Sequence, residues 1–549
     1  MNFIANIFGQ LEAAGDTVIL RELRTDQTIT ATGRELLEMV GRARAFLAGH
    51  GLRKGDRCAL LAHNSIRWIA IDLAIIAEGL IVVPLYARQA AAELVAMMKD
   101  CSPSLICCGD GSLRSEIVQN WQAAPPQYLF DEIFSVAGVG RPVQPVVAES
   151  DPVAIIYTSG TSGEAKGVVL TAGNIGHILG CTSARLDLLM RHRPGQDRVY
   201  QWAPLCFAAA RITLMTSLLR RSLIWMNTDL TKLAAEIRTV APDYFVNVPA
   251  LLERVRRAVD EQLWKTGGFP LTVYSHAKAA WVRKQEGKAS AADAVWLRLA
   301  YFLIFPAIRK KMIGKNLKAL ICGSAPLSVE TQQYFMMLGI PVLQVYGLTE
   351  TAAICTMDDP RHVEPGRVGP AINGVEMKLG ENEEILVRGP NVFQGYWNRP
   401  QETAKALRDG WFHTGDQGAV NASGNWSVIG RIKNLIILNS GHNIAPEPIE
   451  DDLLQNLPGA QQVVLVGNGR SYVSAIVTGE VTQPQVQAAV DFVNIELPHY
   501  KQIRAFRVFP EPFTIESGLL TANGKLKRDL IASRLKGEIE DMYRVKQAV

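Results

Sequence analysis

The sequence predicts an α/β protein whose large N-terminal domain contains two doubly wound αβ subdomains and a small β-barrel, followed by an α+β C-terminal domain. Three observations lead to this prediction. Helical and strand patterns alternate over the first 130 residues and again from Asp151 to about Tyr346. After Gly366, short strands are separated by Gly, Asn and Pro, as in EEILVRGPNVFQGYW, and a compact α+β segment begins beyond Gly430.

The first αβ subdomain is predicted from four segments. Apolar residues recur at helical spacing over Gly33 to His50 and over Ile66 to Ala77. Short apolar runs typical of buried strands cover Arg57 to Ala62 and Leu80 to Pro84. This alternation predicts βαβ units, and therefore a parallel sheet with helices on both faces.

The strands and the helix of the later part of the chain are predicted in the same way. We expect strands at Lys318 to Cys322 and at Val342 to Tyr346 in the second αβ subdomain. In the C-terminal region, a helix is expected over Ala445 to Leu457, because Pro446 stands near its start. The strand QVVLVG should follow at Gln462 to Gly467.

The overall composition excludes several classes of protein. A net charge of +4 over 549 residues, without a long Lys/Arg block, does not predict a nucleic-acid partner. The eight cysteines are scattered, with no CxxC pair or nearby histidine at metal-ligand spacing, as is typical of a reducing compartment. Because the N-terminus does not have the pattern of a secretory signal, we expect a cytoplasmic protein.

One apolar run raises the question of membrane contact. Val295 to Ile308 is shorter than the roughly 20 residues of a membrane span and contains Arg298 and Pro306. Three basic residues, Arg309 to Lys311, follow it. The run is therefore expected either to lie at the surface of an anionic membrane or to pack as a helix within its own domain. The oligomeric state is not predicted.

A loop rich in glycine and hydroxyl side chains predicts phosphate binding. The β-branched strand Val153 to Thr158 opens into this loop, where glycines allow close approach of an anion and Lys166 supplies positive charge. It is not a Walker A loop, because Lys166 is followed by Gly167 and Val168 rather than by Ser or Thr. The predicted contacts to the nucleotide are Thr158, Ser159, Gly160, Thr161, Ser162, Gly163 and Lys166.

Together with later motifs, this loop resembles the adenylate-forming superfamily of acyl-CoA synthetases, luciferases and peptide-synthetase adenylation domains. The further motifs appear in that family's order: GSAP from Gly323, YGLTE from Tyr346, WFHTGD from Trp411, and LTANGKLKRD around Lys525. The loop itself departs from the family pattern, with Glu164 and Ala165 where relatives often have a small residue and proline.

The resemblance assigns a nucleotide site. It implies that Gly323, Ser324 and Ala325 line an adenine pocket, and that Tyr346 stacks on the base beside Gly347. These residues end two predicted strands, and open parallel sheets bind ligands outside the carboxyl ends of their strands.

The resemblance also assigns the polar groups around the phosphates and the ribose. Asp416 would accept the two ribose hydroxyls and Arg431 would donate to the ribose or phosphate. Thr349 would contact the α-phosphate, and Glu350 would hold Mg²⁺ with Thr158 near it, since Mg²⁺ prefers oxygen ligands.

The resemblance also assigns a catalytic lysine and a mobile C-terminal domain. By resemblance, Lys525 neutralises the attacking carboxylate and the α-phosphate, so that Lys525, Thr349 and Glu350 form the catalytic set. Lys433 lies at the family's hinge, which implies an N-terminal core of residues 1–432 and a mobile C-terminal domain of residues 433–549. Gly441, in NSGHN, belongs to the loop that forms the thiol tunnel after adenylation.

The segment Glu253 to Leu317 resembles the long-chain branch of acyl-CoA synthetases. Phe207 stands where relatives usually have histidine, and with Ala209 and Ala210 it would form an apolar wall suited to an alkyl tail. The expected reaction is therefore ATP- and Mg²⁺-dependent ligation of a medium- or long-chain fatty acid to coenzyme A.

Two other functions stay open. A fatty-acyl-AMP ligase or acyl-carrier-protein synthetase performs the same first half-reaction but transfers the acyl group to a phosphopantetheine arm. A non-catalytic nucleotide or acyl binder is disfavoured, because the polar residues expected of an enzyme are all present, namely Lys166, Glu350, Asp416, Arg431 and Lys525.

Overall fold

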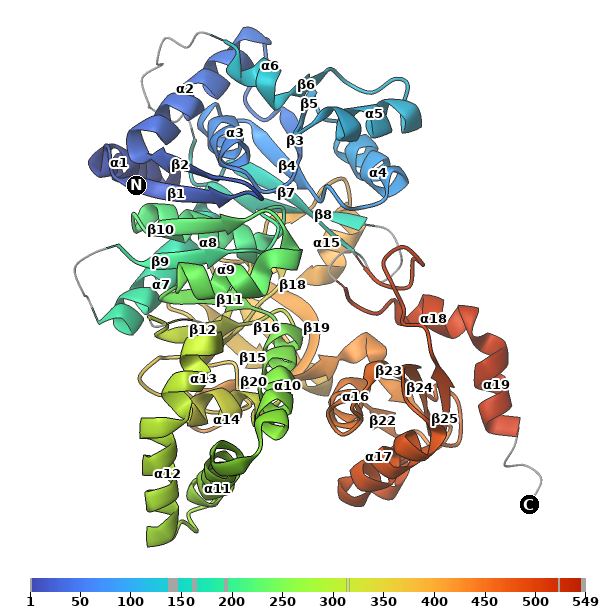
Figure 1. Cartoon of the computed structure of the whole chain (residues 1–549). Coiled ribbons are helices and arrows are strands. Elements are labelled where there is room, and N and C mark those ends of the chain that lie inside the picture. Colours follow the sequence, from blue (N-terminus) through green and yellow to red (C-terminus); the bar gives the residue numbers. More distant parts are fainter. Residues whose placement is uncertain are drawn as a thin grey trace.

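A computed structural model describes residues 2–136, 147–159, 165–191, 196–312, 314, 316–521 and 524–544. The chain folds into two mixed αβ units, a small antiparallel sheet and a C-terminal α+β domain (Figure 1). This is the α/β architecture that the sequence predicts.

The first unit is a seven-stranded sheet in the order β17-β8-β7-β4-β3-β5-β6. Its central strands are parallel, and β7 and β8 form an antiparallel hairpin whose turn is the predicted phosphate loop. The strands are β3 (Arg57–Leu61), β4 (Ile81–Leu85), β5 (Leu105–Cys108), β6 (Gln127–Leu129), β7 (Pro152–Ser159), β8 (Ala165–Thr171) and β17 (Gly395–Tyr396).

The helices of this unit begin where the sequence expects them. Thr32 and Glu35 form a capping box that starts α2 (Gly33–Gly49), and the Ser65 side chain caps α3 (Ile66–Ala77). Their apolar residues belong to one buried core, in which α3 packs against β3 and β4 and α2 packs on α3. The remaining helices are α1 (Phe3–Ala14), α4 (Ala91–Cys101), α5 (Gly111–Asn120) and α6 (Phe130–Phe134).

The second unit is an eight-stranded sheet in the order β14-β13-β12-β11-β9-β10-β1-β2. Its inner strands are parallel and its two edge strands are antiparallel to their neighbours. The strands are β1 (Val18–Leu23), β2 (Thr28–Thr32), β9 (Arg198–Gln201), β10 (Leu223–Asn227), β11 (Tyr244–Asn247), β12 (Ala319–Cys322), β13 (Val342–Tyr346) and β14 (Thr356–Met357).

The two sheets exchange strands, which the linear order of the segments does not reveal. The hairpin of β1 and β2, from the first 130 residues, pairs with β10 in the second sheet. Conversely, β7 and β8 follow Asp151 but complete the first sheet. The helices of the second unit are α7 (Ala172–Met190), α8 (Ala208–Leu219), α9 (Leu233–Val240), α10 (Pro249–Thr266), α11 (Gly268–Gln285), α12 (Ala291–Leu303), α13 (Phe305–Met312) and α14 (Val329–Met337).

A buried ion pair connects the two units. Arg211, on α8, donates to Asp72, on α3, at 2.8 Å, and both side chains are at most 2% exposed. Because separating such a pair would leave an unpaired buried charge, the contact fixes the position of α8 against the first unit.

The region after Gly366 forms a five-stranded antiparallel sheet, β15-β16-β19-β18 with β20 paired to β19. The register sets Asp416 on β19 directly opposite Arg431 on β20. The elements are β15 (Glu376–Leu379), β16 (Glu384–Arg388), α15 (Pro400–Ala406), β18 (Leu407–Arg408), β19 (Trp411–Val420) and β20 (Trp426–Arg431).

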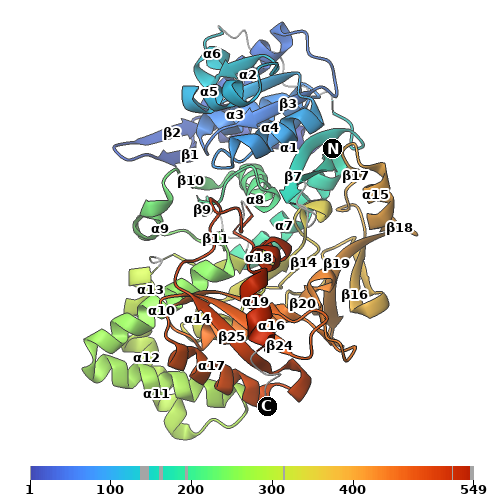
Figure 2. The same ribbon diagram turned by 90° about the vertical axis from the view of Figure 1, so that its right-hand side faces the viewer.

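The C-terminal domain packs helices on a three-stranded sheet, and Figure 2 shows α18 and α19 beside it. The helix expected at Ala445 to Leu457 is α16 (Pro446–Gln455), with Ala445 as its N-cap. The other elements are β21 (Ile436–Ile437), β22 (Asn443–Ile444), β23 (Ala460–Val466), β24 (Val473–Gly479), α17 (Gln483–Glu496), β25 (Ile503–Phe509), α18 (Arg528–Arg534) and α19 (Lys536–Arg544).

Within the described residues, no individual helix has both the length and the apolar character required to cross a bilayer. The apolar run of the sequence is divided between α12 and α13, which are bent by 43° relative to each other. The eight cysteines, all within the described ranges, are free thiols.

Candidate active site

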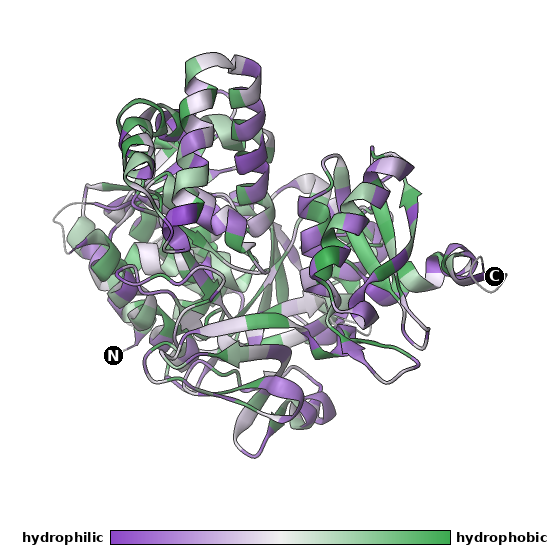
Figure 3. Ribbon diagram, turned by 90° about the horizontal axis from the view of Figure 1, so that it is seen from below, coloured by the Kyte–Doolittle hydropathy of each residue, from purple (hydrophilic) through white to green (hydrophobic). Residues whose placement is uncertain are grey.

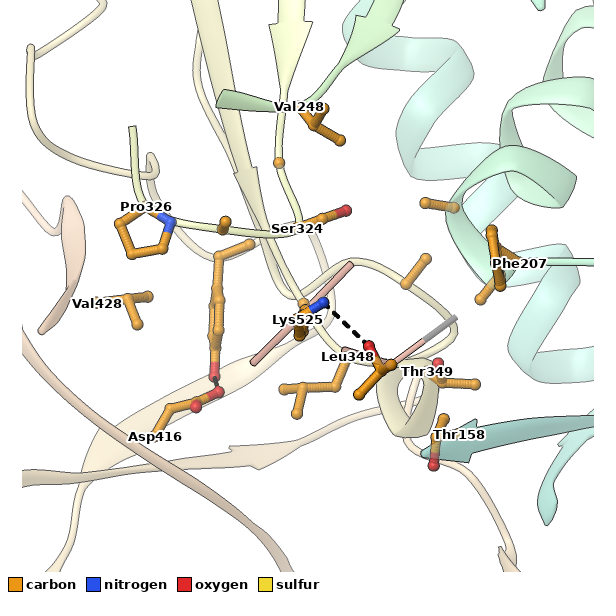
Figure 4. A pocket seen from close by; sticks show the side chains of 18 of the residues that line it. Thr158, Phe207, Val248, Ser324, Pro326, Leu348, Thr349, Asp416, Val428 and Lys525 are labelled. Atoms are coloured by element: carbon orange, nitrogen blue, oxygen red, sulfur yellow. Dashed lines mark hydrogen bonds between the residues drawn. The ribbon is translucent and has the colours of Figure 1, made fainter. Parts of the chain in front are cut away.

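A cleft of about 2580 Å³ brings together residues from both αβ units, the antiparallel sheet and the C-terminal domain. Figure 4 shows Phe207, Ser324, Thr349, Asp416 and Lys525 around it. The predicted residues that line this cleft are Thr158, Lys166, Phe207, Ala210, Gly323, Ser324, Ala325, Tyr346, Gly347, Thr349, Glu350, Asp416, Arg431 and Lys525.

Part of the predicted phosphate loop lies outside the described residues. Gly160, Thr161, Ser162 and Gly163 lie outside the described residues, as does the side chain of Ser159. The flanking Thr158 and Lys166 are paired in the register of β7 and β8, so both ends of the loop reach the cleft.

Two strand ends of the second sheet form the proposed adenine side of the cleft. A Cβ atom at Gly323 would lie 2.7 Å from Val345 Cγ2, and one at Gly347 would lie 2.3 Å from the Ala353 carbonyl oxygen. Only glycine fits at these two positions. Ser324 has a φ of 75°, in the left-handed region that is costly for a side chain with a Cβ atom, and such strain often marks a functional turn.

Asp416 forms the centre of a buried polar group. Its Oδ2 accepts a hydrogen bond from the Tyr346 hydroxyl at 2.7 Å, and its Oδ1 forms an ion pair with Arg431 Nε at 2.7 Å. Burial raises the pKa of Asp416, while Arg431 acts in the opposite direction. Arg431 also donates to the Thr414 carbonyl oxygen at 3.0 Å. These contacts orient both carboxylate oxygens, each of which can accept a further hydrogen bond.

A second polar group contains Glu350 and the lysine of the phosphate loop. Glu350 lies in the 3₁₀ turn Thr349–Thr351 that follows β13, and its Oε1 accepts a hydrogen bond from the Tyr396 hydroxyl at 2.8 Å. Lys166 Nζ lies 5.3 Å from the centre of the same tyrosine ring and 2.6 Å from Glu402 Oε2. Tyr396 therefore connects the candidate metal ligand with the phosphate-loop lysine.

No motif of the sequence marks Tyr396 or Glu402 as a site residue. Tyr396 reaches the site because β17 pairs with β8, which sets Tyr396 opposite Val168, two residues after Lys166. Glu402 lies on the short helix α15 that follows, where an isolated carboxylate carries no motif.

Lys525 reaches this cleft from the C-terminal domain. Figure 4 shows its amine pointing toward Thr349. Desolvation in the cleft lowers the pKa of Lys525, and Arg431 adds to this effect, whereas Asp416 and Glu350 oppose it. Its neighbour Lys527 instead forms an ion pair of 3.9 Å with Glu93 on α4.

The predicted apolar wall lies at the start of α8. Phe207 is the N-cap residue of α8, and its ring lies 5.4 Å from that of Tyr86. Ala210 is 3% exposed and lines the cleft together with Ala209. Beyond this wall, the cleft is lined by Thr182, Leu186, Ile212, Thr213, Tyr244 and Val246.

Gly441 does not line the cleft in this arrangement. It lies between β21 and β22 with a φ of 83°, which favours glycine. The neighbouring His442 stacks on Tyr500 with ring centres 4.4 Å apart, as expected of a structural loop residue. Lys433 does line the cleft, in the 3₁₀ turn Ile432–Asn434, and burial lowers its pKa.

Two carboxylates lie near each other where the C-terminal domain meets the second αβ unit. They are Glu253, on α10, and Asp451, on α16. Burial raises the pKa of Asp451 to about 7, with further contributions from the carboxylates around it. Burial also raises the pKa of Glu253. The charged groups that face Asp451 are Glu253, Glu447, Glu450, Asp452 and Arg528.

This arrangement predicts a loss of stability between about pH 4 and pH 7. A carboxyl with a raised pKa in the folded state favours folding below its unfolded pKa, and loses this contribution as the pH rises through the folded pKa. Asp451→Asn should therefore raise the Tm by several degrees at pH 8, with little change near pH 4. Thermal denaturation across this range measures the effect. The exposed Glu496→Gln serves as control, and a wild-type pH profile in Asp451→Asn would contradict the assignment.

Comparison with known proteins identifies the family of the chain. The model of the AMP-binding enzyme family matches residues 8–397, and that of the AMP-binding enzyme C-terminal domain matches residues 433–547. The chain is 27% identical over 591 aligned positions to the long-chain-fatty-acid–CoA ligase FadD15 of Mycobacterium bovis, covering 99% of this chain and 97% of that protein.

Two further similarities extend the comparison. The chloroplastic long-chain-fatty-acid–[acyl-carrier-protein] ligase AEE15 of Arabidopsis thaliana is 25% identical, covering 97% of this chain and 85% of that protein. The structure of o-succinylbenzoate CoA synthetase (MenE) from Bacillus subtilis with its acyl-adenylate intermediate has a TM-score of 0.75 and 21% identity, covering 96% and 97% of the two chains. Since the first family model matches residues 8–397, which is more than half of the sequence, the chain belongs to the family of AMP-binding enzymes.

Proposed function

We propose that the protein ligates a medium- or long-chain fatty acid to coenzyme A through an acyl-adenylate, releasing pyrophosphate and AMP. One observation carries this proposal: Lys525 enters a cleft that also contains Asp416, Glu350 and the ends of the phosphate loop. Full-length similarity to a fatty-acid–CoA ligase supports the choice of acid and acceptor.

The cleft suits ATP in a defined orientation. The turn Gly323–Ala325 and the Tyr346 ring would hold the adenine, because both line the cleft at the carboxyl ends of the neighbouring parallel strands β12 and β13. Asp416, held by Tyr346 and Arg431, would accept the vicinal ribose hydroxyls. Thr158 and Lys166 would then meet the phosphates at the ends of β7 and β8.

The residues also fit Mg²⁺ bound together with nucleotide phosphates. Among the described residues, no group of three or more His, Cys, Asp or Glu side chains could hold a metal alone. Mg²⁺ usually takes one or two carboxylates and completes its shell with phosphates and water. Glu350 fits this role, since among the described residues a hydrogen bond from Tyr396 reaches only one of its oxygens, and Thr158 supplies a hydroxyl in the same cleft. When bound, the metal would neutralise charge that develops on the leaving pyrophosphate.

In the first half-reaction, a carboxylate oxygen of the fatty acid attacks the α-phosphorus, and the bond to pyrophosphate breaks. The two anions repel each other, so a positive charge between them lowers the barrier. Lys525 supplies this charge from the C-terminal domain, and Thr349 would contact the α-phosphate from the turn after β13. The site thus requires the C-terminal domain to be docked.

In the second half-reaction, the thiol of coenzyme A loses its proton and attacks the acyl carbonyl carbon, and AMP leaves. This step would require the domain of residues 433–549 to turn about Lys433, withdrawing Lys525 and moving the loop of Gly441 toward the cleft. The contacts of the docked state support such a rotation. The ion pair from Lys527 to Glu93 is long, and Glu253 and Asp451 repel each other.

The wall at the start of α8 should limit chain length. Because Ala210 is buried in the cleft lining, Ala210→Trp would fill the space proposed for the alkyl tail. We expect kcat/KM for palmitate to fall about tenfold or more while that for octanoate changes little. Pyrophosphate release measured over a series of fatty acids tests this. An equal loss for both acids would exclude the wall as a determinant of chain length.

The similarity to AEE15 favours one alternative, transfer to an acyl carrier protein. The acceptor is tested by supplying fatty acid and ATP with either free coenzyme A or holo-acyl-carrier protein, and by detecting the thioester by mass spectrometry. We expect the coenzyme A thioester. Acylation of the carrier protein alone would establish the alternative, and accumulation of acyl-AMP with both acceptors would refute the thioesterification step.

A further inference from the structure

A strongly basic segment of the chain carries several exposed apolar side chains. The helices α10 to α13, residues 249–312, contain twelve Lys or Arg and five Asp or Glu residues, a net charge of +7. The whole chain carries only +4, so the remaining residues together are negative. Positive charge is therefore concentrated in about one eighth of the sequence, which sets up a local field rather than an evenly mixed surface.

Large apolar side chains are exposed on the same helices. Phe302 is 79% exposed, Trp264 71%, Val295 64% and Phe269 59%. Val295, Arg298 and Phe302 recur at helical spacing, so the outer face of α12 presents two apolar side chains with a cation between them. We call the helices α10 to α13 with these exposed residues the hairpin surface.

The hairpin surface is a rigid projection. Figures 1 and 3 show α11 and α12 extending side by side from the body of the protein. The rings of His276 and Trp296 stack between the two helices with centres 4.4 Å apart, and Arg283 forms an ion pair with Asp293. The exposed side chains of α12 thus lie on a folded helix rather than on a loose segment.

One helix connects this surface with the catalytic cleft. Val248, Pro249 and Ala250, at the start of α10, line the cleft, whereas Trp264 and Lys265 lie near its other end. Eighteen helical residues span about 27 Å. The hairpin surface therefore lies away from the reacting groups but is connected to the cleft by a single straight element.

These features match an anionic lipid bilayer. Exposed aromatic rings favour the interface of a bilayer, and surrounding lysine and arginine residues attract anionic headgroups. The bend of 43° between α12 and α13 and the charges on both helices argue for contact at the surface rather than a span. The exposed Lys310 and Lys311 lie in the last turn of α13, the helix that follows α12 after the bend.

We propose that the hairpin surface docks the protein on anionic membranes, with Phe302, Val295 and Trp264 entering the interface and Lys310 and Lys311 contacting the headgroups. The proposal rests on the charge and exposure of these helices and not on the ligase activity. It would place the cleft beside a bilayer, into which long-chain fatty acids partition.

Vesicle flotation with the full-length protein tests the proposal. We expect binding to phosphatidylcholine vesicles with about 30 mol% phosphatidylglycerol, little binding to pure phosphatidylcholine, and loss of binding at high salt. Val295→Ser/Phe302→Ser and, separately, Lys310→Glu/Lys311→Glu should each reduce the bound fraction about tenfold. Adenylation of octanoate, a water-soluble acid, should stay unchanged and shows that both variants fold.

The chain offers a matched control on another helix. Phe492 and Ile495 are 59% and 76% exposed on α17, whose charged residues Asp491 and Glu496 are acidic. Phe492→Ser/Ile495→Ser should leave vesicle binding unchanged. Equal binding by the hairpin variants and the wild type would overturn the proposal. An absence of vesicle binding by the wild type would also overturn it, whether or not the same residues mediate self-association or binding of duplex DNA.

Discussion

Replacing Lys525 by alanine should reduce the rate of acyl-adenylate formation by about 10²–10³-fold, the usual effect of removing one group that stabilises charge in a transition state. Lys525 is the cationic side chain that the C-terminal domain directs at the Thr349 turn in Figure 4, close to Asp416 and Glu350. Single-turnover measurement of acyl-AMP from ATP and palmitate gives the rate. Thioester formation from purified acyl-AMP should change little, because that step begins after Lys525 has left the cleft.

Lys527→Ala is the matched control for this experiment. Lys527 lies two residues away, but its ion pair with Glu93 is 3.9 Å long and both side chains are partly exposed. Pairs of this kind contribute at most about 1 kcal/mol, so the rate of adenylation should fall by less than about fivefold. A large effect of Lys527→Ala together with a small effect of Lys525→Ala would move the catalytic role to the other lysine.

Asp416→Ala should lower kcat/KM for ATP by about 10²–10³-fold and also destabilise the protein. The substitution removes the proposed acceptor of the ribose hydroxyls, and it leaves Arg431 and the Tyr346 hydroxyl without their present partner. Because Asp416 is buried but the Arg431 side chain is 35% exposed, the loss of stability should lie between the about 1 kcal/mol of an exposed pair and the about 3–5 kcal/mol of a fully buried one. Initial-rate kinetics with varied ATP and denaturant unfolding measure the two effects.

An exposed pair in the same sheet supplies the control. Glu376, on β15, pairs with Arg388, on β16, at 2.5 Å, and both side chains are about half exposed. Glu376→Ala should change stability by less than about 1 kcal/mol and leave the KM for ATP unaltered. If Asp416→Ala lost stability but kept a normal KM for ATP, Asp416 would be a structural residue rather than a nucleotide ligand.

Much of the fold could be predicted because its elements depend on local periodicity. The helix at Ile66–Ala77 and the strand at Val342–Tyr346 agree with the expected bounds, since each is a mainly apolar segment. The exchange of strands between the two sheets could not be predicted. It depends on long-range pairing, as when the hairpin of β1 and β2 joins β10 in the second sheet rather than β3 and β4, the next strands along the chain.

The candidate site, too, could be predicted only in part from the sequence. Motifs that end strands, such as the residues around Gly323 and Tyr346, could be assigned to one cleft because the carboxyl ends of parallel strands meet at one edge. The contact from Tyr396 to Glu350 joins segments 46 residues apart and has no motif of its own. Likewise, the carboxylates of Glu253 and Asp451 lie near each other only because the C-terminal domain docks against α10.

The central claim, adenylation of a fatty acid by this cleft, is tested most directly by ATP–pyrophosphate exchange in the absence of coenzyme A. We predict exchange that requires Mg²⁺ and a medium- or long-chain fatty acid, that is weak with acetate, and that falls about 10²–10³-fold in Lys525→Ala. Exchange that is absent with every acid from acetate to oleate, or that is equal in the wild type and in Lys525→Ala, would contradict the claim.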